Sequence, residues 1–204
     1  MANKNNAAEW LPRVLFESFL ITISILVALA LDEWRENRED AENVQQALSN
    51  FVSEIQQNQA RIDDAAPFNR GLLNVLRNRY DTDDIGSIDD FVNMVGSYSP
   101  ADLQTTAWET ALATGSLAKM EYNVVSALSF TYSRQNRYQI ATQSGMSDLT
   151  SLQNLSDDRL DLAIYNSIRY MTDISSVESD LSEYFNEASI VVESAITARN
   201  SKPD

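Results

Sequence analysis

The chemistry open to this chain is narrow, because its 204 residues include neither cysteine nor histidine. Without cysteine there are no disulfides, thiolate nucleophiles, iron–sulfur ligands or cysteine-based zinc sites. Without histidine, the usual general base near neutral pH and the commonest transition-metal ligand are also missing. Carboxylates, lysine, tyrosine, serine and threonine remain, and five scattered glycines form no phosphate-binding loop. We therefore expect a protein that is not an enzyme and carries no cofactor.

An acidic loop over residues 81–86 invites comparison with a calcium-binding EF-hand. Four residues match positions 1, 3, 6 and 9 of that template: Asp81, Asp83, Gly86 and Asp89. Ile85 and Val92 then replace two ligands, including the bidentate glutamate at position 12. The sequence favours a solvated turn before an acid-rich helix N-terminus, and it predicts no metal site.

The segment 130–138 is rich in tyrosine and arginine, and two interpretations of it stay open. Arg134 and Arg137, together with the neighbouring tyrosines, are residue types that line pockets for small anions. Core aromatics beside solvated arginines explain the same pattern, and we favour that interpretation.

An apolar run, Val14 to Leu31, is the element that must position any site near the N-terminus. Eighteen helical residues reach roughly 27 Å, close to the hydrocarbon thickness of a bilayer. Trp10 and Trp34 flank the run at a spacing that suits one tryptophan in each interfacial belt. With Arg13 and Arg35 they are the predicted interface anchors.

Glu17 lies inside this run, where an ionisable group is a functional candidate by default. One interpretation is local, because Arg13 lies one turn earlier and the two charges can neutralise each other at the interface. The other adds a stripe spaced 4, 3 and 4 along one helix face: Glu17, Ile21, Ser24 and Ala28. Small and polar side chains let membrane helices approach closely, so the hypothesis is that this face docks another transmembrane helix.

A cleaved signal peptide is the main rival for the apolar run. It would be shorter and followed by a small-residue cleavage site, of which Ala28-Leu29-Ala30 is a weak match, so we favour an uncleaved anchor. The positive-inside rule gives nearly a tie, because Lys4 and Arg13 precede the run while Arg35 and Arg38 follow it. The short N-terminal tail favours a cytoplasmic N-terminus and a domain in the periplasm or outside the cell.

The sequence divides into a tail at 1–12, a transmembrane helix at 13–34 and an acidic helical-bundle domain at 35–200. The formal net charge of -15 repels phosphate backbones and argues against nucleic-acid binding. No convincing strand pair occurs, so the predicted fold is all-α, with one transmembrane helix that continues into a bundle.

Two apolar seams predict long helices at either end of the domain, and we expect them to pack antiparallel. The first helix runs to about Asp64, with a seam at Val44, Leu48, Phe51, Ile55 and Ile62. The last helix follows Ser156 and is either continuous or broken near Ser175-Ser176. Its seams are Leu160, Ile164, Ile168 and Met171, then Val177, Leu181, Tyr184, Ala188, Val191 and Ala195.

Shorter helices are predicted between the two long ones. Pro67 begins a helix over 68–80, Ser87 caps a helix over 88–95, and Ser99-Pro100 begins a helix to about Thr114 that ends at Gly115. A further helix from Leu117 is interrupted at Gly145. The predicted core residues of this middle region are Trp108, Leu112 and Leu117.

Two stretches together resemble a group of uncharacterised bacterial single-span membrane proteins. The first, Phe16 to Glu36, has a glutamate early in the span and a polar-tryptophan exit. The second, Thr106 to Leu117, reads aromatic-Glu-x-x-x-x-(Ser/Thr)-Gly-x-Leu and is followed by Tyr132. The N-terminal flank departs from the group in being less basic. The resemblance implies an anchor helix and a helical domain, with no activity to carry over.

The leading hypothesis is a non-enzymatic interaction protein of the bacterial inner membrane, an accessory or structural subunit of a larger assembly such as an energy-transducing complex. Its expected partners are the lipid bilayer and other membrane-protein subunits bound through the transmembrane helix, and a homo-oligomer is open. The alternative is an extracytoplasmic ligand-binding, sensor-like helical domain. A hydrolase or transferase that uses carboxylates is a third hypothesis.

Overall fold

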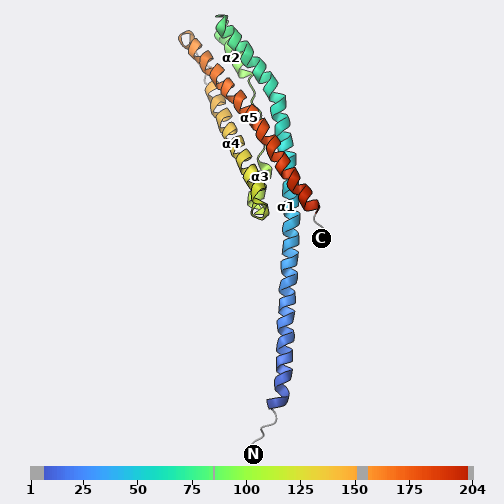
Figure 1. Ribbon diagram of the computed structural model, residues 1–204. Helices are drawn as coiled ribbons and strands as arrows, with labels where there is room; N and C mark the ends of the chain where they lie inside the picture. The colour runs from blue at the N-terminus through green and yellow to red at the C-terminus, as the bar shows by residue number, and fades with distance from the viewer. Residues whose placement is uncertain (1–6, 85, 151–155, 202–204) are drawn as a thin grey trace, which may run out of the picture. The chain divides into compact units, whose positions relative to one another are not determined.

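The computed structural model describes residues 7–84, 86–150 and 156–201. Within these residues the chain is helical and contains no strand, which confirms the all-α prediction (Figure 1). The α-helices are α1 (Ala7–Asp81), α2 (Ile88–Gly96), α3 (Thr106–Ala113), α4 (Tyr122–Thr150) and α5 (Leu160–Asn200). Two short 3-10 helices, η1 (Ser116–Lys119) and η3 (Asp157–Arg159), precede α4 and α5.

The chain divides into two compact units, Met1–Val44 and Gln45–Asp204, and α1 contributes residues to both. In the described residues, one helix is long and apolar enough to cross a membrane, namely α1 from Arg13 onward. Its most apolar stretch is not buried within the protein at all. By length and composition this is a candidate membrane span, a test that an N-terminal signal sequence also passes.

The predicted seam of the first helix is confirmed, since its five side chains are each no more than 2% exposed. Asn58 occupies the one step at which the apolar pattern fails, and it is fully buried. The helix extends further than expected at both ends, because it begins at Ala7 and continues to Asp81.

Pro67 does not begin a separate helix over 68–80, so that prediction is wrong. Proline removes its own N–H from the helical ladder and crowds the carbonyl four residues earlier, but the exposed ring of Pro67 is on the outer side of α1. Ala66, Asn69, Leu73 and Leu76 stay buried on the inner side, so packing holds the helix together across the proline.

Gly145 does not interrupt α4, which runs through it to Thr150. A Cβ built on Gly145 would overlap the ring of Tyr170 on α5. The Tyr170 hydroxyl donates a hydrogen bond to the carbonyl of Thr142 on α4, 3.3 Å away. The glycine therefore serves close packing between α4 and α5, which run side by side as a hairpin (Figure 1).

The last helix, α5, is continuous from Leu160 to Asn200, which decides against a break near Ser175-Ser176. Its second seam differs from the predicted one, because Val177, Tyr184, Val191 and Ala195 are only half-buried. The buried ladder is Ile174, Glu178, Leu181, Phe185, Ala188 and Val192, also spaced 4-3-4-3-4. The large ring of Phe185 occupies the core, while Tyr184 packs at the side against Phe130 on α4.

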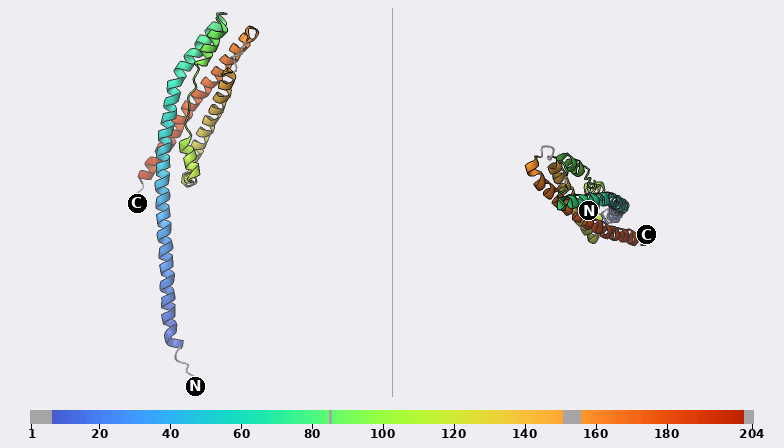
Figure 2. Two further views of the ribbon diagram at one scale, coloured as in Figure 1. Left: turned by 180° about the vertical axis from the view of Figure 1, so that it is seen from behind. Right: turned by 90° about the horizontal axis from the view of Figure 1, so that it is seen from above.

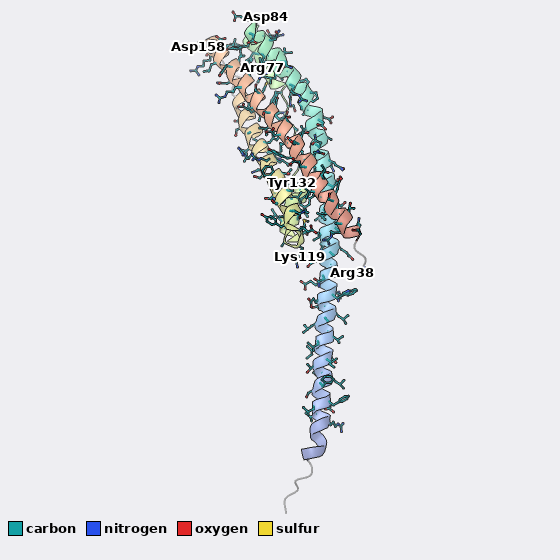
Figure 3. The ribbon with its side chains drawn as sticks, in the orientation of Figure 1. Arg38, Arg77, Asp84, Lys119, Tyr132 and Asp158 are labelled. Atoms are coloured by element: carbon teal, nitrogen blue, oxygen red, sulfur yellow. The ribbon has the colours of Figure 1, made fainter. Side chains whose placement is uncertain are left out.

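The second unit's part of α1 packs antiparallel to α5, which confirms that prediction. Gln59 donates a hydrogen bond to Ser182, and Arg77 donates one to Thr172, so rising numbers on α1 meet falling numbers on α5. Figure 3 labels Arg77 on α1.

Between these helices, Ser87 caps the start of α2 as predicted, and it forms a capping box with Asp90. The Ser87 backbone N–H and hydroxyl both donate to this carboxylate, which lowers the pKa of Asp90. Gly115 adopts a left-handed φ of 72° after α3, as a helix stop requires.

The helix predicted to begin at Ser99-Pro100 begins instead at Thr106, because residues 98–105 form no helix. The predicted core position of Leu112 is also wrong, since its side chain is 56% exposed. Ala107 and Ala111 are buried in its place, and their small side chains bring α3 close to its neighbours.

We expect Gly145→Ala to lower the free energy of unfolding by about 1–3 kcal/mol, because the new methyl group must displace the Tyr170 ring. Gly71→Ala is the matched control. It lies within α1 with no atom within 4 Å of its added methyl, so it should stabilise by about 0.5–1 kcal/mol. Urea unfolding of the full chain in detergent micelles measures both changes. Equal effects of the two substitutions would contradict the packing role of Gly145.

Candidate functional site

The predicted docking face of the membrane segment, Glu17, Ile21, Ser24 and Ala28, lies on α1 and is exposed along its length. Ser24 donates its hydroxyl to the carbonyl of Leu20 at 2.8 Å, which satisfies its hydrogen within its own helix. Thr22 does the same with the carbonyl of Ser18 at 2.9 Å. These hydroxyls are therefore suited to an apolar surrounding, and the docking role of the face stays a prediction.

Glu17 makes the local pair that the sequence allowed. Its Oε1 lies 3.2 Å from Nε of Arg13, one turn earlier, and both side chains are well exposed. The pair reduces the charge that Glu17 brings to the start of the span. It leaves the second carboxylate oxygen available to a donor on a neighbouring helix.

Of the predicted interface anchors, Trp34 is 59% exposed and the guanidinium of Arg38 lies 5.9 Å from its ring centroid. Arg13 and Arg35 are exposed as well. Trp10 lies in the first turns of α1, and its side chain falls outside the described part of the structure. The anchoring role of all four stays a prediction.

The second unit contains an extended segment, residues 98–105, which we call the strap. It joins α2 to α3 and runs lengthwise along the bundle (Figure 2). Tyr98, Ala101 and Leu103 are buried, whereas Asp102 and Gln104 are exposed. Extended backbone packed against helices has no ladder partner, so its buried N–H and C=O groups need side chains or water as hydrogen-bond partners.

Two asparagines on α1 supply those partners. Asn69 donates to the carbonyl of Ser99 at 2.8 Å and accepts from its N–H at 3.1 Å. Asn58 does the same with Gln104, at 2.8 Å in both directions. Each carboxamide thus imitates the peptide of a neighbouring strand and fixes one end of the strap.

Helix α4 holds the strap from the other side. Gln135 donates to the carbonyl of Gln104 at 2.6 Å, and its own Oε1 accepts from Asn58 at 3.2 Å. Gln139 donates to the carbonyl of Leu103 at 2.7 Å. The strap is therefore clamped between α1 and α4 by amide side chains.

Glu54 on α1 is a buried carboxylate with both oxygens in use. Oε2 accepts from the backbone N–H of Ala107 at 2.8 Å, and Oε1 accepts from the Tyr132 hydroxyl at 2.7 Å. The Tyr132 ring stacks on Trp108 at 5.4 Å between centroids, and Figure 3 labels Tyr132. Burial raises the pKa of Tyr132 and the bond to Glu54 raises it further, so the phenol stays a donor.

Glu178 on α5 is a second buried carboxylate, 2% exposed, but only one of its two oxygens accepts a hydrogen bond within the described residues. Oε1 accepts from the Tyr138 hydroxyl at 2.9 Å, while Oε2 has no hydrogen-bond partner among the described residues. The hydroxyl of Tyr98 in the strap likewise has none there. Burial raises the pKa of Glu178, against smaller opposing effects of Tyr138 and of Arg70.

The two carboxylates face tyrosines, so the cluster offers hydrogen bonds between helices rather than a nucleophile with its base. Neither glutamate lines any of the three surface depressions described next. Within residues 7–84, 86–150 and 156–201, no three carboxylates gather as a metal site.

The segment 130–138 separates into two parts. Tyr132 and Tyr138 are core residues, at 4% and 0% exposure. Arg134 and Arg137 line a depression of about 180 Å³ together with Asp180 of α5, whose carboxylate opposes an anionic ligand. Arg134 also lies over the Phe130 ring, 4.9 Å from its centroid. This arrangement matches the favoured interpretation of core aromatics beside solvated arginines.

A longer groove runs between α1 and α5. One stretch, of about 640 Å³, lies over Ile55 and Phe185, and the next, of about 510 Å³, extends towards Thr197. Gln56 lines both stretches, so they adjoin along the same helix pair.

Sequence reasoning missed Glu54, Asn58 and Glu178, although the sequence carries a signal for the last two. Asn58 stands at the gap in the first apolar seam, and Glu178 occupies a rung of the buried 4-3-4-3-4 ladder of α5. A polar residue at a seam position predicts a buried hydrogen bond, since exposure there would turn the helix out of register.

Glu178→Gln and Glu54→Gln form a matched pair with opposite expected outcomes. Folding raises the pKa of Glu178, so its contribution to stability is complete below its unfolded pKa and is lost as pH rises through the folded value. The Glu178→Gln variant has no carboxyl to ionise at this position, so its free energy of unfolding should not fall in this way. As pH rises, the variant should therefore become more stable than the natural chain. Glu54→Gln should lose about 1–3 kcal/mol at neutral pH, because the amide nitrogen that replaces one carboxylate oxygen cannot accept the hydrogen bond that Tyr132 or Ala107 donates to it.

Urea unfolding of the three proteins at several pH values measures these differences. The acidic residues shared by all three cancel in the comparison, which isolates the substituted carboxyl. The same pH dependence in Glu178→Gln and the natural chain would contradict the assignment.

Comparison of the chain with protein-family models, with curated proteins and with solved structures finds no match.

Proposed function

We propose that this chain is a membrane-anchored, non-enzymatic interaction protein. In this proposal it is an accessory or structural subunit of a larger bacterial membrane assembly, for which an energy-transducing complex is one example. The observation that carries the proposal is the apolar part of α1, which is entirely uncovered by the rest of the protein.

The chemistry of that helix supports a protein partner in addition to lipid. A purely anchoring span needs only apolar residues, whereas this one presents a carboxylate, a hydroxyl and a small side chain on one face through Glu17, Ser24 and Ala28. Close approach of two helices in a bilayer depends on such residues, because lipid tails compete equally for large apolar side chains.

The second unit supports a structural role. Its buried polar side chains form hydrogen bonds that join α1, the strap, α4 and α5. Its two buried glutamates accept hydrogen bonds from tyrosine hydroxyls. The alternative function, an extracytoplasmic ligand-binding sensor, is favoured by the 640 Å³ stretch of the α1–α5 groove, whose volume suits a small molecule. That stretch is an open groove between two helices, a form that favours a macromolecular partner.

We further propose that the chain resides in the bacterial inner membrane with its second unit in the periplasm. The basic residues at the two flanks of the candidate span balance, with Lys4 and Arg13 before it and Arg35 and Arg38 after it, so the topology measurement below decides the orientation. The six acidic residues between 32 and 42 count little in that rule.

A photo-crosslinking scan tests the proposed docking face. We expect a photoreactive amino acid at Ser24 or Ala28 to yield a protein adduct in native membranes. The control positions, Phe19 and Leu26, lie on the opposite face of the same helix and should yield lipid adducts only. Protein adducts from all four positions, or from the control face alone, would refute the docking face.

The absence of cysteine makes a topology test direct. Tyr122 is 87% exposed, so Tyr122→Cys should react with a membrane-impermeant maleimide in spheroplasts, which are intact cells without an outer membrane. Reaction only after lysis would place the second unit in the cytoplasm. The natural chain, with no thiol, is the blank.

A further inference from the structure

The groove between α1 and α5 is lined by hydrogen-bonding groups over an apolar floor. Ile55 and Phe185 form the floor and are almost fully buried. Serine, asparagine and glutamine side chains dominate the walls: Ser49, Ser53, Gln56, Gln59, Ser179, Ser182, Asn186 and Ser189. Three of the α5 residues that line the first stretch are serines, Ser179, Ser182 and Ser189, and their small side chains leave room between the two helices.

Charge along the groove has one sign. Glu183 lines the first stretch and Glu193 the second, and neither stretch is lined by lysine or arginine. The sequence extends this asymmetry, because α1 has no basic residue from Gln45 to Ala60 and α5 has none from Tyr170 to Ala198. A surface of this kind attracts cationic groups and repels anionic ones.

The side chain of Gln59 adds a specific acceptor. Its Nε2 donates both to Oδ1 of Asp63, at 3.0 Å, and to the Ser182 hydroxyl, at 2.6 Å. A carboxylate needs a donor, so Asp63 fixes which way the amide points. Oε1 of Gln59 is then left buried without a hydrogen-bond partner in the described residues. Turning of the Gln59 side chain towards the groove would let a donor from a partner satisfy this acceptor.

We propose that this groove binds a basic helix of a partner protein, with lysine or arginine side chains laid along it. The apolar floor accommodates the methylene stems of such side chains, and Glu183, Glu193 and the Gln59 carbonyl receive their charged ends. A helix fits because the groove follows two long antiparallel helices, the setting in which a third helix packs. This inference rests on the proposed interaction role and names the partner chemistry for a surface distinct from the Glu17 face.

The test uses the full chain in zwitterionic nanodiscs and two labelled helical peptides of about 20 residues, enough to follow the groove at 1.5 Å per residue. Both peptides are built from alanine and glutamine, which have little affinity for lipid. One carries five lysines on a single face, and the other carries five glutamates in the same places. We expect fluorescence anisotropy to show binding of the lysine peptide alone, with empty nanodiscs as the blank.

Variants of the groove separate specific binding from the attraction of any acidic protein for a basic peptide. Glu183→Gln with Glu193→Gln should weaken binding about tenfold. The control pair Glu121→Gln with Asp161→Asn removes the same charge elsewhere, from exposed positions, and should change binding by less than about twofold. Equal losses in the two pairs would overturn the proposal.

A steric variant tests the location without changing charge. Asn186 is exposed in the groove, so Asn186→Trp should fill the first stretch and abolish binding. Asn166→Trp, at an exposed position of α5 outside the groove lining, should leave binding intact. Full binding by Asn186→Trp would overturn the groove assignment. The crosslinks from Ser24 and Ala28 are independent of both variants, so failure of the groove and failure of the membrane face are distinguishable.

Discussion

The bundle depends on satisfying an extended backbone inside a helical protein. The strap has no neighbouring strand, yet Tyr98, Ala101 and Leu103 carry it into the core. Asn69 and Asn58 solve this problem, because each presents a donor and an acceptor to the C=O and N–H of a single strap residue. Because the strap leads into α3, these bonds also deliver the Ala107 N–H to Glu54 and place Trp108 against Tyr132. Much of the interior is therefore arranged around two carboxamides.

The two buried glutamates show how similar positions acquire different properties. Glu54 meets a backbone N–H as well as a phenol, whereas Glu178 meets a phenol alone. A carboxylate with two donors is tied into the fold, while one with a single donor favours the protonated form in the same surroundings. The difference arises from whether a helix N-terminus, here that of α3, lies within reach.

The sequence predicts the parts of the fold that repeat or terminate locally. Apolar spacing identified the long first helix and its antiparallel partner, and the Ser87–Asp90 box and Gly115 marked ends that the structure confirms. Failures came where distant contacts override local signals. Pro67 and Gly145 read as breaks, yet packing carries α1 through one, and the other admits the Tyr170 ring. The extended conformation of residues 98–105 depends on Asn58 and Asn69, which lie 30 to 46 residues away in sequence.

The same distance dependence explains the missed site residues. Nothing near Glu178 in the sequence distinguishes it from a solvated acid, and only the ladder to which it belongs reveals its burial. The proposed docking face, by contrast, was predicted from local spacing alone, because the faces of one helix follow from its own periodicity. The groove forms only where α1 and α5 pack together, so neither helix predicts it alone. Its negative charge depends on which residues of the two helices line it, and these include no lysine or arginine.

The spacing of Asn58 and Asn69 constrains how this protein can change over evolution. Eleven residues make about three helical turns, so both side chains face the strap from one side of α1. Inserting or deleting a single residue between them rotates one asparagine side chain by about 100° around the helix relative to the other, which releases one end of the strap. Substitutions on the outer face of this stretch leave both asparagines on the side of α1 that faces the strap. Insertions and deletions among homologous chains should therefore occur in the turns between helices. The number of residues between the two asparagines should stay constant, while exposed residues in that interval are substituted freely.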